Sequence, residues 1–253
     1  MNSPKRSLAD MHKRPLKKRL LVEVSASEAP CSSVELLARA GRLAGHSLGE
    51  VAAILGERVP DDFRRAKGWT GRIVERILGA HALSRAEPDF PQLGIELKTI
   101  PVDREGRPRE STFVCSVPLT QMATETWPTS LVLKKLERVL FIPIQADPDR
   151  PIASRRLGNP LLWSPTADER LILREDWEDF LDLVARGFVE SVTAHRGRAL
   201  QIRPKGKNAR ARRWGLDDDG SVFRTPPRAF YLRASFTAKI LRRSFLVPSS
   251  GIR

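Results

Sequence analysis

The sequence predicts a mixed α/β protein in which helices flank a central β-sheet. Apolar residues recur at helical spacing after serine-initiated capping signals, within residues 32–43 and 47–55. Residues 95–98 alternate apolar and charged side chains, and residues 139–144 are almost continuously apolar, as strands are. At 253 residues the chain can form one large domain or two small ones with a substantial core.

Composition and charge point to a polyanionic partner. The chain has 41% hydrophobic and 29% charged residues, which is typical of a soluble globular protein. Its formal net charge of +14 and pI of about 10.6 favour nucleic acid first and an anionic membrane second. No apolar run reaches the roughly 18–20 residues that span a bilayer, and the basic start lacks the apolar stretch of a secretory signal. We therefore expect a cytoplasmic protein without a membrane partner.

Residues 1–30 are predicted to form a flexible basic tail in front of a folded domain over 31–253. The tail is rich in Lys and Arg and has little apolar periodicity. It could act as a nonspecific phosphate-binding arm, or it could be a dispensable extension.

The first two predicted helices, over 32–43 and 47–55, are expected to pack against the core. Their connection at residues 45–46 could suggest a helix-turn-helix. The second helix, however, is rich in Ala, Val and Leu and has no basic face at its start. Packing is therefore the more economical interpretation of both helices.

A third helix is predicted over 72–78. It follows a glycine-containing segment that includes Gly68 and ends at Gly79, a typical helix stop. Glycines at its start would let a phosphate approach the main chain closely. From the pattern alone, Glu75 within this helix would be an ordinary solvated residue.

The stretch 88–119 contains the candidate site. The alternation at 95–98 places Glu96 and Lys98 together on one face of a strand. Asp89 lies seven residues before Glu96, across a segment containing Pro and Gly that suits a turn back onto the strand. The three side chains can thus converge at the end of the strand.

The pattern Asp-x6-Glu-x-Lys suits a metal-dependent phosphodiesterase. Asp89 and Glu96 offer hard oxygen ligands to Mg2+, for which Mn2+ is a plausible substitute. Lys98 could orient a water or stabilise the charge that develops on a phosphate. On spacing alone, a strand with a charged and solvated face is the more common explanation. The four histidines have no metal-ligand spacing.

The segments that follow predict further strands and helices. Residues 102–109 should form a hairpin connection to a strand over 111–117 that places Phe113, Cys115 and Val117 on one face. A buried strand is expected over 139–144. A helix over 168–188 should carry an acidic face, which would repel DNA and could meet a partner protein.

A second functional zone spans residues 195–214, which hold eight Lys or Arg and no acidic residue. A short strand over 200–205 runs there into a basic loop. Arg can bind the O6 and N7 atoms of guanine, and Lys can reach the same edge, although either can instead hold phosphates. The run 229–233 contains the only tyrosine, and a helix is predicted over 235–245.

Residues 94–119, GIELKTIPVDREGRPRESTFVCSVPL, resemble the MutH family of DNA mismatch-repair endonucleases, and the resemblance extends from about residue 34 to about residue 246. It implies a restriction-endonuclease-like fold, with a central β-sheet flanked by helices and two arms that form a DNA cleft. It also implies that Asp89, Glu96 and Lys98 form the active site, with Asp89 and Glu96 as metal ligands.

The resemblance implies further residues around the active site. Glu75 matches an additional acidic group at the metal site. Lys135 matches a lysine that approaches the site, although adjacent Lys134 leaves the register uncertain by one residue. Lys67 matches a basic residue that faces the DNA backbone, and Gly68 lies beside it.

The resemblance also implies how DNA would be read. Arg203 and Lys205 match a loop that enters the major groove at the sequence GATC. Tyr231 matches the residue at the adenine whose methylation blocks cleavage. Phosphate contacts are expected from Lys207, Arg210, Arg212 and Arg213.

The implied function is a Mg2+-dependent endonuclease of methyl-directed mismatch repair. It would nick the unmethylated strand of double-stranded DNA at hemimethylated GATC sites and would be activated by MutL. A stand-alone GATC restriction endonuclease would share the site but cut both strands without MutL. A non-catalytic, sequence-specific DNA-binding module is a third possibility, against which the presence of Asp89, Glu96 and Lys98 argues.

Overall fold

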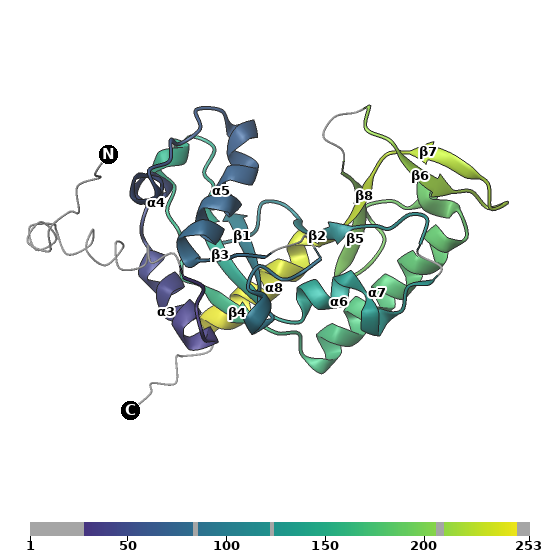
Figure 1. Ribbon diagram of the computed structural model, residues 1–253, viewed down its shortest axis with the longest axis horizontal. Coiled ribbons are helices and arrows are strands. Elements are labelled where there is room, and N and C mark those ends of the chain that lie inside the picture. The colour runs from purple at the N-terminus through teal and green to yellow at the C-terminus, as the bar shows by residue number, and fades with distance from the viewer. Residues whose placement is uncertain (1–27, 83–85, 122–123, 206–209, 247–253) are drawn as a thin grey trace, which may run out of the picture.

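The computed structural model of the chain describes residues 28–82, 86–121, 124–205 and 210–246. The predicted tail lies outside these residues up to position 27. The mixed α/β class is confirmed (Figure 1). The α-helices of the described part are α3 (Ser33–Leu43), α4 (Leu48–Leu55), α5 (Phe63–Leu78), α6 (Leu131–Leu136), α7 (Ala167–Ala185) and α8 (Ala234–Leu246). Its strands are β1 (Glu96–Val102), β2 (Thr112–Ser116), β3 (Val139–Gln145), β4 (Leu161–Trp163), β5 (Leu200–Pro204), β6 (Arg213–Leu216), β7 (Val222–Thr225) and β8 (Arg228–Leu232).

The described strands form three small sheets, where the sequence had suggested one central sheet. The first has the order β1-β3-β4, with β1 and β3 parallel and β4 antiparallel to β3. The second, β2-β8-β5, is antiparallel, and β6 and β7 form a hairpin. Figure 1 shows α3, α4 and α5 with β1 and β3 in one arm, and α7 with β5 to β8 in the other. Among the described residues, no helix is long and apolar enough to cross a membrane.

Both predicted serine caps at the start of α3 and α4 are confirmed. Ser32 accepts a hydrogen bond from the amide of Glu35 at 3.1 Å, but the Glu35 carboxylate accepts from the amide of Cys31 instead of completing the capping box. At α4 the box is complete, because Ser47 and Glu50 each accept from the other's amide. The apolar stripe of α4 is buried in the core, which confirms that the helix packs.

Helix α5 begins at Phe63, nine residues before the predicted start, and ends as predicted before Gly79, which has a φ of +77°. Gly68 and Gly71 lie inside this helix, where glycine costs about 1 kcal/mol relative to alanine. Packing overrides that cost, because Trp69 and Ile73 are buried on the face that meets the rest of this arm. The helix positions Glu75 over β1.

The predicted hairpin between β1 and β2 is wrong. A tight turn does form, since the amide of Gly106 donates to the carbonyl of Asp103 at 3.0 Å. β2, however, belongs to the second sheet, where it pairs with β8. β1 pairs along its whole length with β3. β3 is apolar on both faces, so it offers β1 a partner that is buried over all but its last residue.

The predicted single apolar face of β2 is also wrong. A bulge between Phe113 and Cys115 interrupts the pairing with β8, and a bulge shifts the alternation of side chains. Val114 and Cys115 are therefore both buried, while Phe113 is only partly buried. The bulge turns the Phe113 ring toward the functional site described below.

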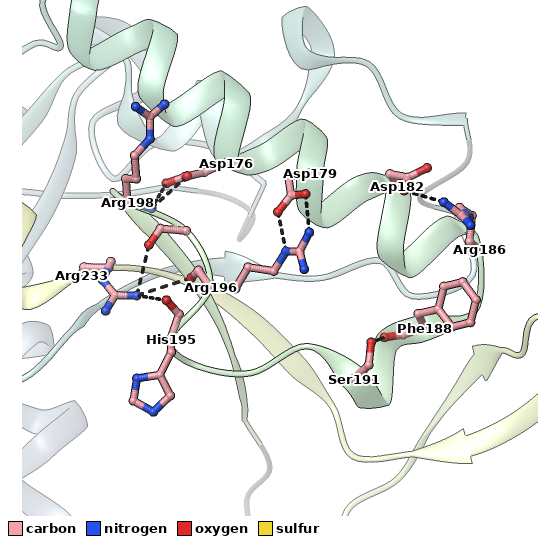
Figure 2. A network of polar contacts seen from close by, with 11 residues as sticks. Asp176, Asp179, Asp182, Arg186, Phe188, Ser191, His195, Arg196, Arg198 and Arg233 are labelled. Atoms are coloured by element: carbon pink, nitrogen blue, oxygen red, sulfur yellow. Dashed lines mark hydrogen bonds and ion pairs between the residues drawn. The ribbon is translucent and has the colours of Figure 1, made fainter.

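Helix α7 anchors the strand that precedes the basic loop. Asp176 is buried in α7, although the sequence had placed the acidic residues on a solvated face. Its carboxylate accepts from the amides of Arg198, Ala199 and Leu200, at 2.6 to 2.9 Å. Figure 2 shows the bonds to Arg198. Together, the bonds from the three amides fix the start of β5, the strand that carries Arg203.

Candidate active site

Glu96 is a buried carboxylate held between two lysines. Its side chain is 4% exposed, and its Oε1 accepts from Lys98 Nζ at 2.6 Å while its Oε2 accepts from Lys135 Nζ at 2.8 Å. Lys135 also donates to the main-chain carbonyl of Glu87. A charge removed from water needs such partners, so Glu96 does not lie on a solvated face of the strand. Of the two neighbouring lysines, Lys135 is the one that contacts Glu96.

Asp89 is brought beside this group by the predicted turn. The amide of Phe90 donates to the carbonyl of Ile95 at 2.9 Å, and Gly94 turns the chain with a φ of +61°. Asp89 Oδ2 then accepts from the amide of Leu97 at 2.8 Å. Burial, followed by the charge of Glu96, raises the pKa of Asp89 above its ordinary value.

Glu75 belongs to the same electrostatic cluster, although it comes from α5. Burial raises the pKa of its carboxyl, and the charge of Asp89 raises it further. Gly71, one turn earlier, leaves room for it: a Cβ there would stand 3.6 Å from Glu75 Oε1 and 3.9 Å from Thr99 Oγ1. Three carboxylates and two lysines therefore share one site.

The donor set suits a hard divalent cation. Among the side chains that the structure describes, no three or more His, Cys, Asp and Glu form a metal-ligand cluster. Mg2+ needs no more than one or two carboxylates, because waters and substrate phosphates complete its coordination. Burial first, and neighbouring carboxylates second, raise the pKa values of Asp89 and Glu75, and a cation would favour their charged forms. Glu96 retains lone pairs beyond those its lysines use.

The residues expected to read DNA gather around the ring of Phe113. Lys205 Nζ lies 2.7 Å from the ring centroid, and Lys98 Nζ lies 5.7 Å from it. The ring of Tyr231 meets the Phe113 ring edge to face, with centroids 5.7 Å apart. Arg203 in turn lies 5.9 Å from the Tyr231 ring. The Phe113 ring therefore lies between Lys98 of the carboxylate site and the residues expected to read DNA, Lys205 and Tyr231.

A cleft of about 1820 Å³ connects the two groups. One wall carries the carboxylates and lysines of the site, and the other carries Lys205 and a series of arginines. The residues that line it include Glu75, Asp89, Glu96, Lys98, Phe113, Lys135, Lys205, Arg210, Arg212, Arg213, Trp214 and Arg224. A groove with one basic wall concentrates polyanions such as DNA.

Three expected DNA contacts stand apart from this description. Gly68 is an exposed residue of α5 with open space around the position of a Cβ. The side chain of neighbouring Lys67 lies outside the described residues, as does the whole of Lys207.

Sequence reasoning missed several residues of the cleft. Phe113 had been predicted to share one face with Cys115 and Val117, because nothing in the sequence signals the bulge that separates them. Trp214 and Arg224 were not singled out, since their pairing depends on the register of β6 and β7. The contact of Lys135 with the main-chain carbonyl of Glu87 could not be predicted, because a main-chain carbonyl does not depend on the residue type.

Comparison with known proteins places this geometry in context. The family model described as "DNA mismatch repair enzyme MutH" matches residues 78–176. The chain is 51% identical over 221 residues to the DNA mismatch repair protein MutH of Klebsiella pneumoniae (strain 342), covering 87% of this chain and 96% of that relative. It is 49% identical over 218 residues to MutH of Serratia proteamaculans (strain 568), covering 86% and 96%. For MutH of Salmonella paratyphi B (strain ATCC BAA-1250 / SPB7) the identity is 50% over 220 residues, covering 87% and 95%.

Proposed function

The chain belongs to the MutH family of DNA mismatch-repair endonucleases, and from this premise we propose that it nicks the unmethylated strand at hemimethylated GATC sites with the help of Mg2+. It is an endonuclease, an enzyme that hydrolyses phosphodiester bonds within DNA. The observation that carries the proposal is the buried Glu96 held by Lys98 and Lys135 beside Asp89.

Asp89 and Glu96 would hold the cation, which we propose to be Mg2+ with Mn2+ as a substitute. When bound, it would lower the pKa of a water that attacks the phosphorus and would offset the charge on the phosphoryl oxygens. Glu75 would add negative charge behind the two ligands. Its raised pKa is the property expected of a carboxyl that gains from a nearby cation.

Lys98 is the proposed catalytic lysine. Its ammonium group lies 2.6 Å from Glu96 and also faces the Phe113 ring, so it stands between the carboxylates and the basic wall of the cleft. From there it could orient the attacking water and stabilise charge on the scissile phosphate. Lys135 would hold Glu96 in place and tie it to the Glu87 main chain.

Sequence recognition would come from the second sheet. We propose that Arg203 and Lys205, at and just beyond the end of β5, read the guanine edges of GATC. Tyr231, paired with Gln201 across the sheet, would stand at the adenine and be obstructed by its methyl group. Lys67, Gly68 and Lys207 are proposed to contact the DNA backbone.

The remaining proposals concern organisation and partners. Residues 31–253 would act as one nuclease domain, with residues 1–30 as a basic tail. A MutL-type protein would activate cleavage at sites near a mismatch. The enzyme would act in the cytoplasm, where bacterial DNA is found.

Cleavage of a plasmid with a single GATC site tests this function. The plasmid would be supplied unmethylated, hemimethylated and fully methylated, each with and without MutL and with Mg2+, Mn2+ or EDTA. We expect a nick confined to the unmethylated strand, raised by MutL, and no cutting of the fully methylated plasmid. MutL-independent cutting of both strands would instead indicate a restriction endonuclease. Binding without any cleavage would contradict the site assignment.

A further inference from the structure

The β6–β7 hairpin presents an aromatic residue and an arginine on its outward face. Trp214 pairs with Arg224 across the two strands, and because side chains alternate along a strand, both project from the same face. On the opposite face, Phe223 packs against the core and Thr225 is fully buried. Trp214 is nevertheless 53% exposed, which is unusual for the largest apolar side chain.

Trp214 and Arg224 form a stacked pair. The guanidinium carbon of Arg224 lies 4.2 Å from the centroid of the Trp214 ring. An arginine held over an aromatic face keeps its charge and its planar donors available to a further partner. Within the described part of the chain, Arg224 has no acidic partner that would occupy those donors.

The Trp214–Arg224 pair faces the cleft, and the basic residues of the hairpin lie at the same end of it as this pair. Both residues line the cleft that contains Glu96 and Lys98. Arg212 and Arg213, just before Trp214 in the chain, line it as well. The hairpin's acidic residues occupy its turn, residues 217–219, at the end away from the Trp214–Arg224 pair. A polyanion would therefore meet the hairpin at its basic end.

We propose that Trp214 and Arg224 form a sequence-independent contact with the sugar–phosphate backbone of duplex DNA that flanks the recognition site. The proposal rests on the proposed function, because it takes the cleft as the place where duplex DNA binds. Arg224 donates to a phosphate, and the Trp214 ring supports the guanidinium and packs against the adjacent deoxyribose. Such a contact adds affinity and fixes orientation but carries no base information.

A binding experiment with two duplexes tests this contact. Both contain one GATC site, one with only a few flanking base pairs and the other with long flanks, and binding is measured in EDTA so that no DNA is cut. Trp214→Ala and Arg224→Ala should each weaken binding to the long duplex by about tenfold, the effect of one good contact. Their affinity for the short duplex should match that of the wild type.

Salt dependence separates a phosphate contact from simple loss of packing. Arg224→Ala should reduce the slope of log affinity against log salt by about 1 on the long duplex, because one phosphate is no longer neutralised. Arg224→Lys keeps the charge and should retain that slope. Val222→Ala is the matched control: Val222 is exposed on the same face of the hairpin but does not line the cleft, so binding should be unchanged.

The outcomes distinguish this contact from the proposed function. An equal loss on both duplexes, or no loss on either, in variants that unfold at the wild-type temperature would overturn the contact. A surface for a partner protein would also give no loss on either duplex. A wild-type protein that binds a long duplex without GATC as tightly as the long duplex with it would contradict the proposed function, whereas a flank-dependent loss in the variants would still support the contact.

Discussion

Lys135 Nζ lies 2.8 Å from Glu96 Oε2, although the two residues are 39 positions apart and belong to α6 and β1. The adjacent Lys134 is exposed on the same helix. One lysine of the pair is therefore part of the buried site and the other is part of the surface, a distinction that their sequence context does not reveal.

Replacing Lys135 should damage both stability and cleavage. Lys135→Ala leaves one oxygen of a buried carboxylate without its cationic partner, and such losses cost about 3 kcal/mol in the free energy of unfolding. Urea denaturation and plasmid nicking would measure the two effects. Lys134→Ala is the matched control and should stay within about 0.5 kcal/mol of the wild type. Equal effects of the two changes would refute the assignment of Lys135.

Replacing Lys98 should separate cleavage from binding. Lys98→Ala removes the cation proposed to act on the attacking water and the phosphate, so single-turnover nicking should fall by about 100-fold or more. Binding to the GATC duplex in EDTA should be largely retained, because other basic residues line the cleft. Cleavage at the wild-type rate would remove Lys98 from the mechanism.

Replacing Asp89 should stabilise the metal-free protein while abolishing cleavage. Burial and the charge of Glu96 raise the pKa of Asp89, so the folded protein binds this proton more tightly than the unfolded chain does. Its contribution to stability is therefore lost as pH rises from the ordinary pKa of an aspartate through the raised value. Asp89→Asn keeps an acceptor for the Leu97 amide and removes the charge.

Thermal unfolding in EDTA would check the Asp89 prediction. The variant should unfold at a higher temperature than the wild type at neutral pH, and the difference should shrink in acid, where the wild-type carboxyl is protonated. A variant that is less stable than the wild type at neutral pH would show that the ionised carboxylate of Asp89 does not destabilise the folded protein.

Replacing Asp176 should destabilise the fold far more than replacing Asp179 on the same helix. Asp176→Ala leaves three buried or half-buried amides, those of Arg198, Ala199 and Leu200, without their acceptor, at a cost of about 3 kcal/mol or more. Asp179 forms an exposed ion pair with Arg196 (Figure 2), and its loss should cost about 1 kcal/mol or less. Urea denaturation would compare them, and similar losses would contradict the anchoring role.

The two cysteines should differ in their reaction with iodoacetamide. Burial raises the pKa of Cys115 to about 12, so its thiol is both protonated and inaccessible in mildly alkaline solution. Cys31 is exposed and should react, although its hydrogen bond to Glu35 raises its pKa as well. Mass spectrometry of the native protein should find Cys31 modified and Cys115 intact. Urea should expose both, and early modification of Cys115 would contradict its burial.

Features that depend on near neighbours in the chain were predictable from the sequence. Serine caps act within one helical turn, so Ser47 and Glu50 were sufficient to predict the start of α4. The return of Asp89 onto β1 needs only a short turn with a glycine at positive φ, and the pattern there indicated it. The convergence of Asp89, Glu96 and Lys98, which form the local part of the site, could therefore be predicted from the sequence.

Features that depend on distant partners were not predictable in the same way. The pairing of β1 with β3 instead of β2 follows from the burial available on β3, which no local pattern in residues 102–112 encodes. The position of Phe113 follows from a bulge that arises only when β2 meets β8. The role of Asp176 depends on amides more than twenty residues away.

The separation of β2 from β1 means that the chain passes repeatedly between the two three-stranded sheets. It passes from β1 to β2, from β2 back to β3 and from β4 to β5. One apolar core also contains residues of both sheets, among them Ile100 and Phe141 of the first and Leu200 and Phe230 of the second. A close-packed core resists deformation. The carboxylate of Glu96 and the ammonium group of Lys205 should therefore keep their separation when a duplex enters the cleft.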